Sequence, residues 1–143
     1  MNREKIQSII PHRPPFLLLD EVVEQTRDRI VCRKRFTGDE FWYQGHYPDY
    51  PLTPGVLLCE ASLQAGAVLL SKQAAEQSSK VPVATRLNNV QFKQMVRPGD
   101  TIEITVELVE RLAAAYFMRA RVTVGEKLAM RCEFACTMTE PQP

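Results

Sequence analysis

Two side chains that exchange protons, a histidine and a glutamate, stand on either side of a loop-to-helix boundary in the middle of the chain. His46 is held between Gly45 and Pro48 in a segment with little conformational freedom, and imidazole moves protons near neutral pH. Glu60 interrupts the most apolar segment of the sequence, 56–70. A carboxylate in such surroundings finds a partner or takes up a proton. The pair therefore indicates a general base, His46, and a general acid, Glu60.

The apolar segment 56–70 is predicted to be a buried helix. It consists almost entirely of Val, Leu, Ala, Cys and Gly, and a helix that is apolar all round belongs in a core. From Gly55 to Ala75, at about 1.5 Å per residue, it would be roughly 30 Å long, the width of a small domain. Its far end is too polar for a membrane span. The remaining chain is therefore expected to wrap around it.

The length and the net charge of the chain limit the number of domains and the kinds of partner to expect. The chain has 143 residues, of which 45% are hydrophobic, so residues 1–143 are expected to form one domain with a single core. Lysine and arginine total 18 against 17 for aspartate and glutamate, a formal net charge of +1. This balance gives no reason to expect binding to nucleic acid or to a membrane.

The cysteines and histidines do not have the spacing of a metal site. No C-x-x-C pair is present and the chain has two histidines, so we expect neither a metal nor another cofactor. The cysteines are interpreted as reduced thiols that fill the core: Cys32, Cys59, Cys132 and Cys136. The charged first residues are not followed by a long apolar run, so a cytoplasmic protein is expected.

The sequence on both sides of the helix reads mainly as strands. Residues 3–10 are predicted to form a short helix, and 22–36 an extended segment with a turn near Arg27-Asp28. The hydrophobic period is two in three later stretches, 101–108, 116–124 and 128–138. The predicted fold is α+β, a long curved antiparallel sheet wrapped around one buried central helix. The free flank of that helix is expected to be covered by a second copy of the chain.

A set of motifs in a fixed order spans almost the whole chain. They are Pro11-His12-Arg13 with Phe16-Leu17-Leu18-Leu19-Asp20, Gln44-Gly45-His46-Tyr47-Pro48, Pro54-Gly55-Val56-Leu57 with Glu60-Ala61 and Gln64, Phe92-Lys93, and Val96-Arg97-Pro98-Gly99-Asp100. Together they resemble the hot-dog-fold (3R)-hydroxyacyl-(acyl carrier protein) dehydratases of type II fatty acid synthesis.

The resemblance implies an enzyme that removes water from a (3R)-hydroxyacyl thioester on acyl carrier protein and leaves the trans-2-enoyl thioester. It also implies that His46 of one subunit meets Glu60 of the other across the interface of a double hot-dog homodimer, which in this family commonly assembles further into a trimer of dimers. A glutamate at position 60 resembles the dehydratase branch, whereas the dehydratase-isomerase branch more often has aspartate there.

Three further roles are expected near this pair. The backbone N–H groups of Gly55 and Val56, at the helix start, would bind the substrate's thioester oxygen. Gln64, one turn after Glu60, would contact the substrate, orient Glu60 or bond to the other subunit. His12 is expected to hold the N-terminal turn together with Asp20.

Some assignments stay open. Thr53, Pro14 and the segment 87–91 depart from the family's common pattern, which leaves the acyl chain length undetermined, and coenzyme A remains an alternative to carrier protein as the handle of the substrate. The basic residues are interpreted as a solvated face or as a docking site for an acidic carrier protein: Arg86, Lys93, Arg97, Arg119 and Arg121.

Two other functions compete with dehydration. A hot-dog thioesterase would share the fold and the acyl pocket but would use its carboxylate to activate water at the carbonyl. A non-catalytic acyl-binding subunit would form the dimer without turnover and would be expected to have lost His46 or Glu60. The chain retains both residues.

Overall fold

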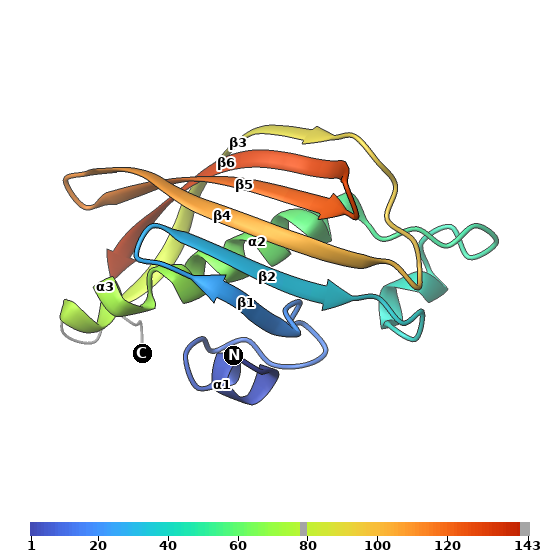
Figure 1. The fold of residues 1–143 in the computed structure, drawn as a ribbon, viewed down its shortest axis with the longest axis horizontal. Coiled ribbons are helices and arrows are strands. Elements are labelled where there is room, and N and C mark those ends of the chain that lie inside the picture. The colour runs from blue at the N-terminus through green and yellow to red at the C-terminus, as the bar shows by residue number, and fades with distance from the viewer. Residues whose placement is uncertain (78–79, 141–143) are drawn as a thin grey trace.

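The computed structural model describes residues 1–77 and 80–140, and its main feature is one six-stranded antiparallel sheet (Figure 1). The strand order is β1-β2-β4-β5-β6-β3, so β1 and β3 form the two edges. The strands are β1 (Glu21–Gln25), β2 (Arg29–Arg35), β3 (Val81–Phe92), β4 (Thr101–Leu112), β5 (Ala115–Val124) and β6 (Lys127–Thr139).

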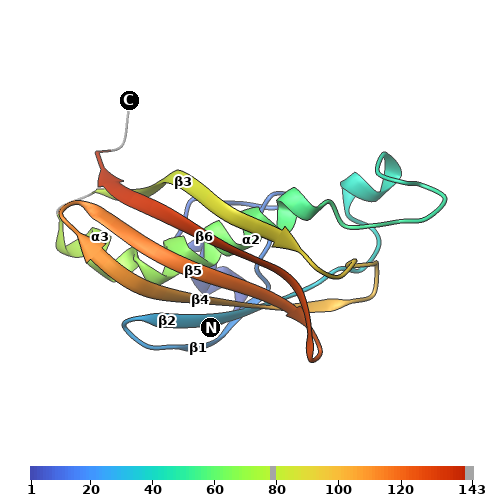
Figure 2. The same cartoon turned by 90° about the horizontal axis from the view of Figure 1, so that it is seen from above.

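The sheet curves around helix α2 (Gly55–Leu69), which packs against β2, β3, β4, β5 and β6 (Figures 1 and 2). The contact is close at Gly66, where an added Cβ would lie 2.8 Å from the ring of Phe134. Alternate residues of β4, such as Ile102, Ile104 and Val106, point into this core and are fully buried. The predicted α+β hot-dog arrangement of a curved sheet around a central helix is confirmed.

The predicted helix from Gly55 to Ala75 is wrong in one respect, because it is divided at Leu70. Leu70 has φ −85° and ψ 0°, and a separate short helix, α3 (Ser71–Glu76), follows it. The division falls where the apolar run ends. The residues that follow are more polar, so burial against the sheet no longer requires them to continue the line of α2. At the N-terminus, α1 spans Arg3–Gln7 and ends before the predicted limit at residue 10.

Strand β3 was not predicted. Most of its residues are exposed on both faces, so the alternation that reveals a half-buried strand is missing. Its pairing with β6 is also irregular between Asn88 and Gln91, where Asn89 has a positive φ of 53°. The strands predicted at 101–108, 116–124 and 128–138 are present, as is the extended segment 22–36 with its turn.

One stripe of α2 is not covered by the sheet. Val56 is 70% exposed, and Glu60, Leu63 and Ala67 follow it at helical spacing and are only half-buried. Glu60 therefore lies on the open stripe of the helix, whereas the sequence suggested a carboxylate that faces the apolar core.

Candidate active site

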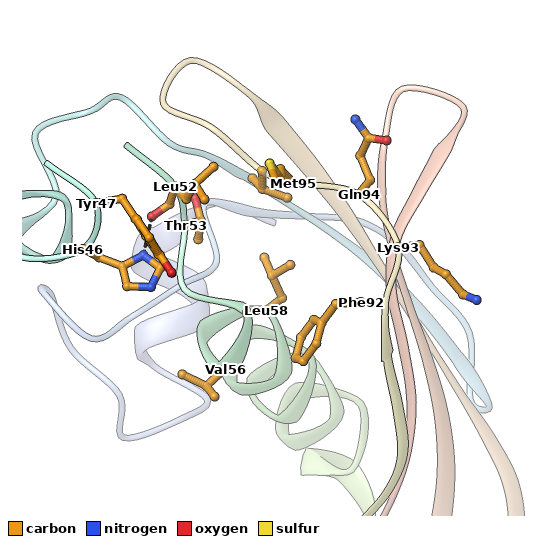
Figure 3. Close-up of a pocket in the computed structure, with 12 residues that line it drawn as sticks. His46, Tyr47, Leu52, Thr53, Val56, Leu58, Phe92, Lys93, Gln94 and Met95 are labelled. Atoms are coloured by element: carbon orange, nitrogen blue, oxygen red, sulfur yellow. Dashed lines mark hydrogen bonds between the residues drawn. The ribbon is translucent and has the colours of Figure 1, made fainter. Parts of the chain in front are cut away.

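A cavity of about 520 Å³ lies at the N-terminal end of α2 (Figure 3). Three segments form it: the loop before the helix, the first turn of the helix, and the end of β3 with the residues after it. Its lining residues are His46, Tyr47, Leu52, Thr53, Gly55, Val56, Leu58, Phe92, Lys93, Gln94, Met95 and Val96. The lining is mostly apolar with one imidazole and one amine, which suits an apolar ligand with a polar reacting end.

The orientation of His46 is set by a backbone group. Its Nδ1 lies 3.0 Å from the carbonyl oxygen of Leu52 (Figure 3). Since a carbonyl only accepts, Nδ1 carries the hydrogen in this contact, and in neutral imidazole Nε2 then keeps its lone pair. Tyr47, the next residue, has a φ of 54°, a conformation that is uncommon for a non-glycine residue and is frequent at functional sites. In neutral His46, Nε2 is therefore the ring nitrogen that can accept a proton.

The loop that carries Leu52 is fastened at Thr53. The Thr53 hydroxyl lies 2.6 Å from the hydroxyl of Tyr43, and both residues are buried. The Thr53 N–H donates to the carbonyl of Val96, at 2.8 Å. Thr53, which departs from the family pattern, therefore joins the loop to the two neighbouring segments. The sequence carried no signal for these contacts.

Gly55 and Val56 begin the helix beside the cavity, as predicted. The N–H of Leu57 donates to the carbonyl of Pro54 at 2.9 Å. The N–H groups of Gly55 and Val56 precede the first residue that has an acceptor within the helix, and the helix dipole favours an anion there. A Cβ at Gly55 would lie 2.6 Å from the Phe92 ring, so glycine is what allows Phe92 to pack on the helix start. The role of Gly55 and Val56 in substrate binding stays a prediction.

Glu60 is not among the residues that line this cavity. Its Oε2 accepts a hydrogen bond from Nε2 of Gln64, at 3.0 Å. Gln64 is fully buried, and it also donates to the carbonyl of Phe16 and accepts from the N–H of Leu18, both at 2.8 Å. Of the three roles considered for Gln64, the structure shows the orienting contact with Glu60. Both of its amide hydrogens are already donated within the chain. Its role in substrate binding stays a prediction.

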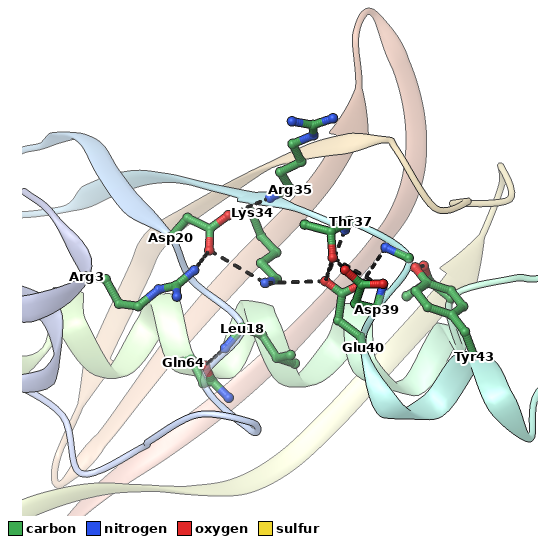
Figure 4. A network of polar contacts seen from close by, with 12 residues as sticks. Arg3, Leu18, Asp20, Lys34, Arg35, Thr37, Asp39, Glu40, Tyr43 and Gln64 are labelled. Carbon is green, nitrogen blue, oxygen red and sulfur yellow. Dashed lines mark hydrogen bonds and ion pairs between the residues drawn. The ribbon is translucent and has the colours of Figure 1, made fainter.

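The predicted pairing of His12 with Asp20 is wrong. Asp20 bonds to Arg3 and to the N–H of Arg35, and Nζ of Lys34 lies 3.5 Å from it (Figure 4). Three positively polarised groups, one from residue 3 and two from residues 34–35, thus surround this carboxylate. His12 lies instead beside Glu60, with 3.7 Å between its Nε2 and the glutamate Oε2.

The basic residues do not form one patch. Lys93 lines the cavity beside His46 and, with Arg97 and Lys127, an adjoining hollow. Arg119 and Arg121 line a different hollow, formed by β3, β4, β5 and β6. Only the first group lies beside the cavity that His46 lines.

The four cysteines are buried and free, as predicted. Burial raises the pKa of Cys32 and of Cys132 to about 12 and that of Cys136 to about 11. Within residues 1–77 and 80–140, no three His, Cys, Asp or Glu side chains gather as a metal site would require. In the same residues, we find no helix with the length and apolarity needed to span a membrane.

The fold occurs in solved structures of different chemistry. A chain of the dehydratase heterocomplex ApeI:P from Xenorhabdus doucetiae superposes with a TM-score of 0.78 at 14% identity, covering 94% of this chain and 91% of that one. A hypothetical thioesterase with coenzyme A from Streptococcus pneumoniae superposes with a TM-score of 0.66 at 13% identity, covering 86% and 88%. These matches establish the fold alone.

Sequence comparison is more specific. The chain is 45% identical over 130 residues to the 3-hydroxyacyl-(acyl-carrier-protein) dehydratase FabZ of Clostridium perfringens, covering 90% of this chain and 92% of that protein. It is 38% identical over 139 residues to the enzyme of the same name from Koribacter versatilis, covering 96% and 88%. A model of the FabA-like domain matches residues 10–133. The chain therefore belongs to the FabA-like domain family.

Proposed function

We propose that residues 1–143 form a single dehydratase domain that removes water from a 3-hydroxyacyl thioester carried on acyl carrier protein. The observation that carries this proposal is the orientation of His46, whose Nδ1 is engaged by Leu52 and whose Nε2 is left to act as a base beside a mostly apolar cavity. The names of the relatives, all dehydratases of this substrate class, support it.

Elimination needs three groups, and the chain offers a candidate for each. His46 Nε2 takes the proton from the α carbon, and the electrons of that C–H bond form the new double bond. The C–O bond at the β carbon breaks, and Glu60 gives a proton to the departing hydroxyl, which leaves as water. The N–H groups of Gly55 and Val56 bind the thioester oxygen while negative charge develops on it.

A second copy of the chain would bring Glu60 to the cavity that holds His46. In one chain, Glu60 lies on the open stripe of α2 that begins at Val56. The 12-residue edge strand β3 carries exposed apolar side chains, including Val83, Leu87 and Phe92. A long edge of this kind is a surface for pairing with another strand. Both features support a homodimer with two sites, each built from His46 of one subunit and Glu60 of the other.

Complementation between two inactive variants tests the shared site. His46→Ala and Glu60→Gln should each abolish elimination. In a mixed dimer, one site has both defects and the other keeps an intact His46 and an intact Glu60. Random pairing of equal amounts should therefore restore roughly a quarter of the sites. If the mixture stays inactive although mixed dimers are isolated with two affinity tags, the site is not shared between subunits.

The reaction itself is tested with a 3-hydroxyacyl carrier protein and, in reverse, with the enoyl form. Reversible loss and gain of water, followed by mass spectrometry of the carrier protein, is the expected result. Release of free thiol without enoyl product would contradict the proposal and would identify the protein as a thioesterase.

Carrier protein is proposed to dock on the basic residues beside the cavity, Lys93, Arg97 and Lys127. A carrier of acidic character would be attracted to them and steered toward His46. Lys127→Glu should raise KM for the carrier-bound substrate with little change in kcat. The matched control is Arg119→Glu, in the separate hollow, for which KM should stay within about twofold of the wild type. Equal effects of the two changes would contradict this docking site.

A further inference from the structure

His12 stands in an unusual position for a residue outside the proposed catalytic pair. Its Nε2 lies 3.7 Å from Oε2 of Glu60, and the two side chains are 27% and 24% exposed. Its Nδ1 is buried, and the described residues provide no hydrogen-bond partner for it. One ring nitrogen is therefore directed at the proposed acid, while the other lies in the protein without a partner.

This asymmetry determines which nitrogen carries the hydrogen. A buried N–H without an acceptor is costly, and with the hydrogen on Nδ1 the lone pair of Nε2 would also face the glutamate oxygen. The hydrogen therefore belongs on Nε2, where Glu60 Oε2 is the facing acceptor. His12 and His46 would then hold opposite neutral forms, since His46 carries its hydrogen on Nδ1.

Gln64 is directed at the same oxygen of the glutamate. Its Nε2 donates to Oε2 at 3.0 Å, and its other contacts, to Phe16 and Leu18, fix the amide in this orientation. Oε2 of Glu60 thus accepts a hydrogen bond from Gln64 of its own helix, and Nε2 of His12, in the N-terminal segment, faces the same oxygen at 3.7 Å.

The N-terminal segment holds His12 firmly enough for this role. The N–H groups of Phe16 and Leu17 both donate to the carbonyl of Arg13, at 2.9 and 3.0 Å. The Arg13 guanidinium in turn donates to the carbonyls of Ile10 and His12. Hydrogen bonds therefore hold the backbone before and after His12, and the bond between Gln64 and the Phe16 carbonyl joins this turn to α2.

We propose that His12 is a positioning residue for Glu60: together with Gln64 it keeps Oε2 as a hydrogen-bond acceptor, so that the proton given to the departing hydroxyl is carried by Oε1. This inference rests on the proposed role of Glu60 as the acid. In this arrangement one oxygen of the carboxyl orients the group and the other performs the transfer, and a freely rotating carboxyl would spend less time in the productive orientation.

Nitrogen NMR of the protein labelled with ¹⁵N at histidine tests the contact without any activity. The chain has two histidines, so a His12→Gln variant assigns both rings. The expected spectrum shows the Nε2–H form for His12 and the Nδ1–H form for His46. A His12 ring in the Nδ1–H form, or one that exchanges freely between the two forms, would overturn the proposal.

Kinetics test the consequence for catalysis. His12→Leu removes the donor and should lower kcat by about 10- to 100-fold with KM within about twofold. His12→Gln, which keeps an N–H donor, should recover most of that loss. If His12→Leu and His12→Gln both fold as dimers and lose the same amount of kcat, His12 has only a structural role. If the wild-type protein gave no enoyl product while the ring forms were as expected, the proposed function would fail and the contact between His12 and Glu60 would stand.

Discussion

The Nδ1 atom of His46 and the carbonyl oxygen of Leu52 lie 3.0 Å apart, and this contact leaves Nε2 of the imidazole as its basic nitrogen. The carbonyl belongs to the loop that leads into α2, so the chemistry of His46 depends on how that loop is held. The residue that holds it is Thr53, through its bonds to Tyr43 and Val96.

Thr53→Val should weaken both stability and turnover. Valine has nearly the same shape but cannot bond to the Tyr43 hydroxyl, which is buried. An unsatisfied buried hydroxyl costs about 1–3 kcal/mol, so the unfolding free energy measured in urea should fall by that amount. A looser Leu52 carbonyl should also lower kcat.

The matched control is the double variant Tyr43→Phe with Thr53→Val. It removes both hydroxyls, and replacing both partners with apolar groups is nearly neutral. Its unfolding free energy should lie closer to the wild type than the sum of the two single changes indicates. Strict additivity would mean that the two hydroxyls do not interact.

Gly55→Ala should damage the cavity more than the fold. The new Cβ would lie 2.6 Å from the ring of Phe92, a side chain at the end of β3 that is 54% exposed in the single chain, so the ring has to turn away from the helix start. We expect kcat/KM to fall about tenfold, since the displaced ring disturbs the wall beside the helix start, while the unfolding free energy changes by less than about 1 kcal/mol. In a Phe92→Leu background the clash is absent, so Gly55→Ala should lower kcat/KM less there than it does in the wild type. A crystal structure with the ring unmoved would contradict this account.

The elements with a clear period could be predicted from the sequence, and the exposed one could not. The apolar run 56–70 and the alternation in 101–108 reflect burial, which depends on residue type and position. Strand β3 is held by its pairing with β6. Backbone hydrogen bonds do not depend on the type of side chain, so the sequence pattern does not indicate them. Its residues are exposed in the single chain, so no alternation revealed them.

The same division applies to the candidate site. His46 and Glu60 could be selected because their side-chain types are unusual in their surroundings. Their partners could not, because Leu52 acts through its backbone and His12 reaches Glu60 only after the N-terminal segment has folded onto α2. Proximity in sequence suggests His12 as the partner of Asp20, whereas in the fold the more distant Arg3 and Lys34 lie beside that carboxylate.

The buried cysteines should resist thiol reagents in the folded protein. The pKa of Cys32 and that of Cys132 are raised by burial to about 12, so at about pH 8 far fewer than one thiol in a thousand is ionised. We expect the folded protein to react with a disulfide reagent at the rate of global unfolding, and all four thiols to react at once in urea. Fast reaction of one thiol in the folded protein would show that its side chain is accessible.

Stability in acid should depend on Glu40, which closes the turn between β2 and the loop of the active site. Burial alone would raise its pKa, but N–H donors from Gly38 and Thr37 and the charge of Lys34 outweigh burial, and the pKa is lowered from its usual value of 4.5 (Figure 4). A carboxyl whose pKa is lower in the folded chain stabilises that state above the unfolded pKa and loses this effect as the pH falls through the folded pKa.

Glu40→Gln should therefore lower the unfolding free energy by about 1 kcal/mol near neutral pH, a modest value because solvent screens part of the charge interaction. The difference from the wild type should shrink as the pH is lowered below 4.5, since the wild-type carboxyl then takes up its proton as well. Urea unfolding of both proteins across this range measures the difference directly. The control is Glu126→Gln, at an exposed position in the turn between β5 and β6, which should change stability little at any pH. A difference for Glu40→Gln that is constant with pH would mean that the carboxyl acts through its shape and not through its charge.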